Sequence, residues 1–267
     1  MQLGISSYTF GWAVGVRGHE PPQPLDEQGL LDKCRALGMK LLQIGDNLPL
    51  HTFDKARLDR LAARALREGV QLEVGARGLS LERIAEYADI ARRLNAKLIR
   101  FVVHDPDFEV KTDAVFGVLR DSLPLLNGLT LGIENHDHIP AAELRGIIEL
   151  VADERIGVCL DTANSLGAGE GIDVVTDLLA PITVNLHVKD FYIERVPHLM
   201  GFTVTGRPAG SGFLNLQTLF QKLSRFRRCH TAVLELWTPP ESNLQQTIAK
   251  ESAWAVQGLE YLKPFFT

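Results

Sequence analysis

The chain alternates between strand-like and helix-like segments over nearly its whole length, and this alternation restricts its fold more than any other feature. The strand-like runs are rich in β-branched and aliphatic residues. The segments between them carry apolar residues at three- and four-residue spacing, which is typical of amphipathic helices. Such alternation indicates parallel strands joined by right-handed crossovers. The strand-like runs are 2–6, 40–45, 71–75, 97–103, 130–134, 156–161, 183–188 and 231–236.

Eight strand–helix units predict a (β/α)8 TIM barrel, with residues 1–267 forming a single domain. A doubly wound open sheet is the alternative, but it usually carries a G-x-G-x-x-G turn after its first strand. The corresponding turn here reads SSYTFGW. Three residues are placed to mark helix boundaries, because Ser80 can cap a helix start and Gly38 and Gly69 can end one.

Two connections are much longer than the rest. They cover residues 8–25, after the first strand, and 189–213, after the seventh. Long loops in compact domains tend to be lids or binding loops. Both are expected at the C-terminal face of the barrel, because every strand-to-helix loop emerges there.

The composition narrows the class of partner. The formal net charge of −5 argues against binding to nucleic acid, which usually requires a basic face. Cys34, Cys159 and Cys229 are odd in number and lack C-x-x-C spacing, which predicts buried thiols in a reducing cytosol. No signal peptide or membrane-spanning run is recognisable. We therefore expect a cytoplasmic protein without a membrane partner, and homo-oligomerisation is left open.

Four strand-like runs end on residues that can bind a divalent cation: Glu134, Asp161, His187 and Glu235. Because strand ends of a barrel share one face, these side chains are expected to converge. Buried carboxylates are costly unless they are paired or metal-bound. The simpler alternative for any one of them is an ion pair or a helix cap. An oxygen-rich set with one imidazole predicts one divalent metal ion, with Mn²⁺ or Mg²⁺ favoured and Co²⁺ or Zn²⁺ possible.

A metal held in this way suits chemistry on a small carbohydrate. When a cation polarises a ketose carbonyl and the adjacent hydroxyl, the neighbouring C–H becomes acidic and an enediolate is stabilised. Glu134 and Glu235 are then the candidates for exchanging protons with the substrate. The substrate predicted from this chemistry is a small carbohydrate or a sugar acid.

The same residues carry a family resemblance. The order I-E-N, L-D-T, H-V-K-D and L-E-L resembles the xylose isomerase-like TIM barrels, which include ketose 3-epimerases, hydroxypyruvate isomerases and 3-oxo-isoapionate decarboxylases. The segment 208–215, PAGSGFLN, is similar to the glycine-rich loop of that family. The resemblance implies that the four residues bind one divalent metal and that the two glutamates exchange protons with the substrate.

The chain departs from the family's epimerases at two positions. The epimerases read D-T-G-H at the sixth strand, with the histidine touching the substrate, whereas this chain reads D-T-A-N and has Asn164 there. Ile193 stands where the epimerases have an arginine. These differences leave the reaction type open between isomerisation and a lyase reaction.

Further polar and aromatic residues are candidates for substrate binding. Arg100 could instead pair with Glu73 or with a metal-site carboxylate, and Lys189 could instead neutralise Asp190. His136 could be a solvated loop residue, and the aromatic residues after the first strand could be core rather than a lid. The candidates are Tyr8, Trp12, Arg77, Arg100, His104, His136, Asn164 and Lys189.

Several functions from different classes remain. The leading hypothesis is a metal-dependent isomerase or epimerase of a small ketose, ketose phosphate or sugar acid. The alternative keeps the site but acts as a lyase, as a 3-oxo sugar acid decarboxylase or a dehydratase. A metal-free glycosidase that uses Glu134 and Glu235, and a non-catalytic sugar sensor, are the weaker possibilities.

Overall fold

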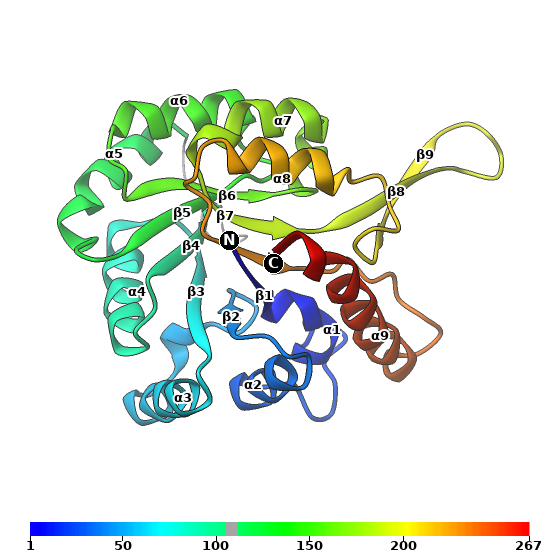
Figure 1. Ribbon diagram of the computed structural model, residues 1–267, viewed down its shortest axis with the longest axis horizontal. Coiled ribbons are helices and arrows are strands. Elements are labelled where there is room, and N and C mark those ends of the chain that lie inside the picture. The colour runs from blue at the N-terminus through cyan, green and yellow to red at the C-terminus, as the bar shows by residue number, and fades with distance from the viewer. Residues whose placement is uncertain (105–111, 267) are drawn as a thin grey trace.

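The computed structural model describes residues 1–104 and 112–266. Eight parallel strands close into a barrel in the order β1-β10-β7-β6-β5-β4-β3-β2, with helices packed around it (Figure 1). The barrel closes where β1 pairs with both β10 and β2. The predicted (β/α)8 fold is therefore confirmed.

The barrel strands coincide with the eight strand-like runs of the sequence to within a few residues. They are β1 (Gln2–Ser6), β2 (Leu41–Ile44), β3 (Gln71–Arg77), β4 (Leu98–Val102), β5 (Thr130–Glu134), β6 (Ile156–Asp161), β7 (Thr183–Val188) and β10 (Thr231–Leu234). The helices are α1 (Gly11–Val14), α2 (Glu27–Ala36), α3 (Lys55–Glu68), α4 (Leu81–Arg93), α5 (Thr112–Ser122), α6 (Ala141–Val151), α7 (Ile172–Leu179), α8 (Leu216–Ser224) and α9 (Leu244–Leu262).

The outer helices form where the sequence supplies caps and one apolar stripe. In α3, Leu58, Leu61 and Ala65 are buried against the barrel, and the other face is charged. The Asp54 side chain accepts the Arg57 N–H at the start of this helix, and Gly69 ends it with a φ of 65°, a left-handed conformation that glycine adopts easily. Ser80 caps α4 as predicted.

The apolar core lies between the strands and the helices, whereas the inside of the barrel is largely polar. Gln43 of β2 reaches across the interior to Asn185 of β7, with 3.1 Å between amide nitrogen and amide oxygen. Glu73 of β3 and Arg100 of β4 are also buried. This polar interior leads towards the C-terminal ends of the strands, where the candidate ligands lie.

The two long connections are more ordered than expected. The first contains the 3-10 turn η1 (Ser7–Phe10) and the short helix α1. The second is not an irregular loop but an antiparallel hairpin of β8 (Asp190–Arg195) and β9 (Phe202–Arg207), which projects from the barrel (Figure 1). A hairpin forms because β-branched and aromatic residues alternate on both sides of a turn that ends at Gly201.

The structure also bears on the expectations about membrane-spanning segments and about the burial of the cysteines. Among the described residues, no helix is long and apolar enough to cross a membrane. All three cysteines are free thiols, but Cys229 is only half-buried, so the expectation that every thiol is buried is wrong for this residue.

A glycine in β6 allows this strand to pack closely against the start of β7. A Cβ at Gly157 would lie 2.5 Å from Val184 Cγ1 and 2.6 Å from the Ile182 carbonyl oxygen. We expect Gly157→Ala to lower the free energy of unfolding by about 1–3 kcal/mol, the usual cost of overpacking. Urea titration followed by circular dichroism measures this change.

Gly146 provides the matched control, because a Cβ there would meet nothing within 4 Å in the exposed middle of α6. Gly146→Ala should leave stability unchanged or raise it by up to about 1 kcal/mol, because alanine favours helix. Equal effects of the two substitutions would contradict the close packing at Gly157.

Candidate metal centre

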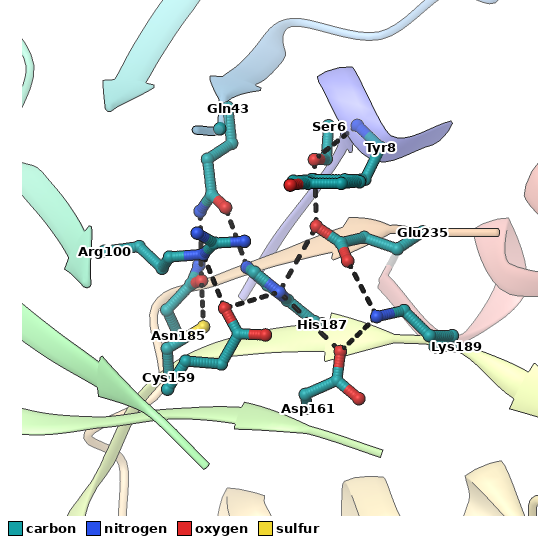
Figure 2. Close-up of polar contacts among 12 residues, drawn as sticks. Ser6, Tyr8, Gln43, Arg100, Cys159, Asp161, Asn185, His187, Lys189 and Glu235 are labelled. Carbon is teal, nitrogen blue, oxygen red and sulfur yellow. Dashed lines mark hydrogen bonds and ion pairs between the residues drawn. The ribbon is translucent and has the colours of Figure 1, made fainter. Parts of the chain in front are cut away.

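The four candidate ligands converge at the C-terminal mouth of the barrel. His187 Nδ1 lies 3.3 Å from Glu235 Oε1, 3.7 Å from Glu134 Oε2 and 3.9 Å from Asp161 Oδ2 (Figure 2). Glu134 and Asp161 are the last residues of their strands, and Glu235 follows β10 directly. All four side chains are buried. The structure therefore brings together the residues that the sequence pattern pointed to.

The orientation of the His187 ring is fixed from inside the barrel. Its Nε2 lies 2.7 Å from Gln43 Oε1, and the Gln43 amide nitrogen donates to Glu73 Oε2 at 3.0 Å and to Asn185 Oδ1 at 3.1 Å (Figure 2). Because the Gln43 oxygen must accept, the proton of the imidazole is on Nε2. Burial lowers the pKa of His187 to about 4, so the ring is neutral. Its Nδ1 lone pair thus faces the three carboxylates.

This arrangement fits a cation. His187 Nδ1 is buried and has no hydrogen-bond partner among the described residues. Glu134 Oε2 and Asp161 Oδ2, which face it, are also buried, and they form ion pairs with Arg100 and Lys189 respectively. A lone pair directed at carboxylate oxygens inside a protein is unfavourable unless a positive charge lies between them. One donor atom each from Asp161, His187 and Glu235 lies within 4.8 Å of the others. The residues present therefore fit a single divalent ion.

Cys159 also lies close to Glu134 and His187 but does not suit a ligand role. Its thiol donates to Asn185 Oδ1 at 3.1 Å. Burial holds the pKa of Cys159 well above its ordinary value, so the thiolate, which is the form that binds metals, is disfavoured before a cation is present.

Lys189 supplies positive charge within the site. Its Nζ lies 2.8 Å from Asp161 Oδ2 and 3.1 Å from Glu235 Oε2, and it donates to Asn164 Oδ1 at 3.3 Å. Burial opposes its charge, but the carboxylates raise the pKa of Lys189 above its usual range, so it stays protonated. The alternative that Lys189 neutralises Asp190 is wrong. The Asp190 carboxylate instead accepts backbone N–H groups from the loop that follows the hairpin.

Arg100 is held by two carboxylates. Its Nε lies 2.5 Å from Glu134 Oε2, and its Nη1 contacts Asp46. Of the two ion pairs considered from the sequence, the one with a metal-site carboxylate is found and the one with Glu73 is not. Burial raises the pKa of Glu134 to about 8; Arg100 only partly opposes this rise, and the neighbouring Asp161 and Glu235 add to it.

Asp46 is a functional residue that the sequence interpretation missed. It accepts the Tyr8 hydroxyl at 3.0 Å and the Arg77 Nε at 2.7 Å, in addition to its contact with Arg100. Burial would raise the pKa of Asp46, but the two guanidinium groups hold it below its usual range. An acidic residue two positions beyond the end of β2 was the available signal. Arg77, whose side chain is 30% exposed, lies at the outer edge of this cluster.

Two short polar side chains position the glutamates. Asn164 donates its amide to Glu134 Oε1 at 2.7 Å. Ser6, also missed from the sequence, donates its hydroxyl to Glu235 Oε1 at 2.9 Å (Figure 2). Its position as the last residue of β1 was the signal that could have identified it.

The aromatic residues after β1 fall into two groups, one packed in the apolar core and one lining a cavity. Phe10 is buried in the core. Tyr8 and Trp12, together with Trp237 and the hairpin residue Val204, line a cavity of about 440 Å³ beside the mouth. The Trp12 Nε1–H is fixed by the Thr238 carbonyl at 2.8 Å.

The remaining candidates lie on the rim. His136, in the loop after β5, contacts Asp137. The ring of His104, just beyond β4, lies 4.3 Å from that of His138.

The protein is a (β/α)8 barrel with carboxylate and imidazole side chains, which are candidate metal ligands, at its C-terminal mouth. Comparison with known families identifies the kind of barrel more closely. Residues 31–265 match the family described as xylose isomerase-like TIM barrel. The chain belongs to the xylose isomerase-like TIM barrel family.

Individual relatives cover almost the whole chain. A 3-oxo-isoapionate decarboxylase of Pectobacterium atrosepticum is 30% identical over 264 residues, or 98% of this chain and 95% of the relative. D-psicose 3-epimerase of Clostridium cellulolyticum has a TM-score of 0.74 at 15% identity, covering 99% of each chain. A Mycobacterium smegmatis protein solved in complex with magnesium has a TM-score of 0.71 at 14% identity, covering 97% of each chain. Proteins with different named activities thus share this barrel fold.

Glu73, beneath the candidate ligands, generates a prediction about pH. Burial raises the pKa of Glu73 to about 7, so the folded protein favours the protonated form. Stability from this preference is present below the ordinary glutamate pKa and is lost as pH rises towards 7. In Glu73→Gln, which imitates the protonated form, that loss should be absent.

The free energy of unfolding should be similar for both proteins near pH 5, and the wild type should then lose ground by at most about 1.4 kcal/mol per pH unit up to pH 7. Urea titrations at each pH, with a chelator present, measure the difference. Parallel stability profiles would contradict a protonated Glu73.

Proposed function

We propose that this protein is a divalent-metal-dependent lyase that decarboxylates a small 3-oxo sugar acid. The support comes from two directions. The relative that is 30% identical over 98% of the chain is a 3-oxo-isoapionate decarboxylase. The site combines oxygen-rich candidate ligands with Lys189, Arg100 and Arg77, a set of cations suited to an anionic substrate.

Glu134, Asp161, His187 and Glu235 would hold the metal ion. Their three carboxylates and one imidazole fit Mn²⁺ or Mg²⁺ best, and Co²⁺ or Zn²⁺ are further options. When bound, such an ion supplies a Lewis acid that draws electron density from a ketone oxygen. Gln43 keeps the Nδ1 lone pair of His187 directed at the ion's position.

Decarboxylation of a 3-oxo acid requires no reactant other than a proton. The bond between the carboxylate carbon and its neighbour breaks, CO₂ leaves, and the electron pair moves towards the ketone oxygen to give an enolate. A proton from the site or from water then adds to the carbon that lost CO₂. The protein's task is to orient the substrate and to stabilise the negative charge that develops on the ketone oxygen.

Lys189 and Arg77 have distinct roles in this proposal. Lys189 is buried beside Asp161 and Glu235, where a permanently charged ammonium can stabilise the developing oxyanion. Arg77 lies farther out and is partly exposed, so it can receive a substrate carboxylate from solvent. Tyr8, Trp12 and Trp237 wall the adjacent cavity and limit the access of water to the enolate.

The observation that carries the proposal is the bridge made by Asn164. Its amide donates to Glu134 at 2.7 Å and accepts from Lys189 at 3.3 Å. The epimerases that the sequence resembles have a histidine at this position, and it contacts the substrate. In this chain, the Asn164 side chain instead fixes Glu134 and Lys189 relative to each other. This arrangement favours the stabilisation of negative charge on the substrate and provides no proton-transferring group at this position.

A direct test uses metal-free protein and a panel of 3-oxo sugar acids. We expect no CO₂ release until Mn²⁺ or Mg²⁺ is added. Asp161→Asn should lower kcat/KM by about 10³-fold, because a Lewis acid contributes several kcal/mol to transition-state stabilisation. Asp177→Asn on the exposed side of α7 is the control and should retain full activity. CO₂ release that persists in a chelator would overturn metal dependence.

A second candidate is an isomerase or epimerase, and one observation favours it. Glu134 and Glu235 both approach His187 Nδ1, at 3.7 Å and 3.3 Å, yet their pKa values shift in opposite directions. Burial raises that of Glu134 to about 8; burial also acts on Glu235, but the positive charges of Lys189 and Arg100 lower its pKa overall. One acid and one base are what proton exchange on two faces of a substrate requires. Solvent deuterium entering a ketose without loss of CO₂ would select this candidate.

Replacement of Lys189 distinguishes a role in catalysis from a role in metal binding. We expect Lys189→Met to lower kcat by about 10²–10³-fold, the usual effect of removing one group that stabilises an oxyanion. The same variant should bind Mn²⁺ at least as tightly as the wild type, because it removes a positive charge from beside the ligands. Stopped assays and calorimetric titration of the metal-free protein measure the two effects.

Lys250→Met is the matched control, because Lys250 pairs with Glu241 outside the mouth. It should change neither quantity. If Lys189→Met lost metal affinity and activity together, Lys189 would be a structural residue rather than a participant in the reaction.

A further inference from the structure

We propose that His136, Asp137 and His138 form a second cation site, at the rim of the barrel mouth. These residues follow Glu134 in the loop between β5 and α6. They are distinct from the buried ligand set and take no part in the proposed reaction. The ligand class is a divalent cation of borderline softness, such as Zn²⁺, Co²⁺ or Ni²⁺.

The donor atoms already converge. Asp137 Oδ1 lies between the two imidazoles, in contact with His136 Nδ1 and 3.2 Å from His138 Nε2. One donor atom from each of the three residues lies within 4.8 Å of the others. A cation among the three atoms would replace the contacts that the two imidazoles now make with Asp137.

The chemistry of these donors differs from that of the buried site. Two imidazoles and one carboxylate are a common protein set for Zn²⁺, whereas Mg²⁺ prefers oxygen ligands. The exposed fractions of the side chains are 30% for His136, 42% for Asp137 and 52% for His138, so the site exchanges freely with solvent. The two sites should therefore differ in metal preference as well as in access.

The loop is held in place on both sides of the three residues. The Asn135 amide donates to the Asp161 carbonyl and to Ser165 Oγ, each at 2.9 Å. Ile139 is buried in the core. Asp137 packs so closely on the turn after β6 that a Cβ at Gly167 would lie 2.6 Å from its Cβ. A fixed backbone reduces the entropy lost when a ligand binds.

A third imidazole lies beside the cluster. The ring of His104, at the end of β4, is 4.3 Å from the ring of His138, centroid to centroid. Packing between these rings restricts the His138 side chain. A cation at this rim would also add positive charge at the entrance that an anionic substrate must cross, although the site itself does not depend on the proposed function.

The test is the stoichiometry of Zn²⁺ binding to metal-free protein without a polyhistidine tag, measured by equilibrium dialysis and elemental analysis. We expect two Zn²⁺ ions per wild-type chain. His136→Ala combined with His138→Ala should retain one, and Asp161→Asn should retain the other. His198→Ala, on the exposed hairpin, is the control for loss of a surface histidine and should retain two. Excess Mg²⁺ should displace Zn²⁺ only from the buried site.

The outcomes separate this proposal from the proposed function. One ion per wild-type chain that is lost in the double histidine variant but kept in Asp161→Asn would support the rim site and contradict the buried one. Two ions in the double histidine variant, or one ion lost only in Asp161→Asn, would overturn the rim site. Circular dichroism of each variant confirms that the fold is retained in these comparisons.

Discussion

The site depends on one electrostatic constraint: three carboxylates are buried around the lone pair of a neutral imidazole. Glu134, Asp161 and Glu235 all lie within 4 Å of His187 Nδ1. An isolated buried carboxylate is expensive, and three neighbouring ones repel each other. Lys189 and Arg100 supply only part of the compensating charge, because Arg100 is shared with Asp46. The balance that remains is negative when all three carboxyl groups are ionised, and a divalent cation would satisfy it.

The inside of the barrel supports that constraint from below. Strands of an ordinary barrel fill the interior with branched apolar residues. Here Gln43, Glu73, Asn185 and Cys159 form a hydrogen-bonded layer that fixes the direction of the Gln43 amide. Since that amide determines which nitrogen of His187 carries the proton, a residue on β2 controls the donor presented by β7. Such supporting contacts tune ligand geometry and metal affinity in many proteins.

The parts of this structure that could be predicted from sequence are those set by short-range pattern. The eight strands follow from apolar runs, and Glu134, Asp161, His187 and Glu235 are recognisable because each stands where such a run ends. Asp46 is different, because it lies two residues beyond a four-residue strand and acquires its partners from η1, β3 and β4 only when the barrel closes. The alternative that Lys189 neutralises Asp190 rested on sequence proximity, whereas the side chain turns towards Asp161 of β6 and Glu235 after β10.

The same barrel fold occurs in proteins with different activities, so function is better argued from the side chains at the mouth than from the fold. The structural neighbours near 15% identity share the barrel alone, while the relative at 30% identity covers nearly all of this chain. Asn164 is where the difference is concentrated: an amide can hold Glu134 and Lys189 in fixed relation, but it cannot exchange a proton as an imidazole can. The contacts of Asn164 therefore fit the proposed stabilisation of charge on one oxygen, which loss of CO₂ from a 3-oxo acid requires, and they add no further proton-transferring group to Glu134 and Glu235.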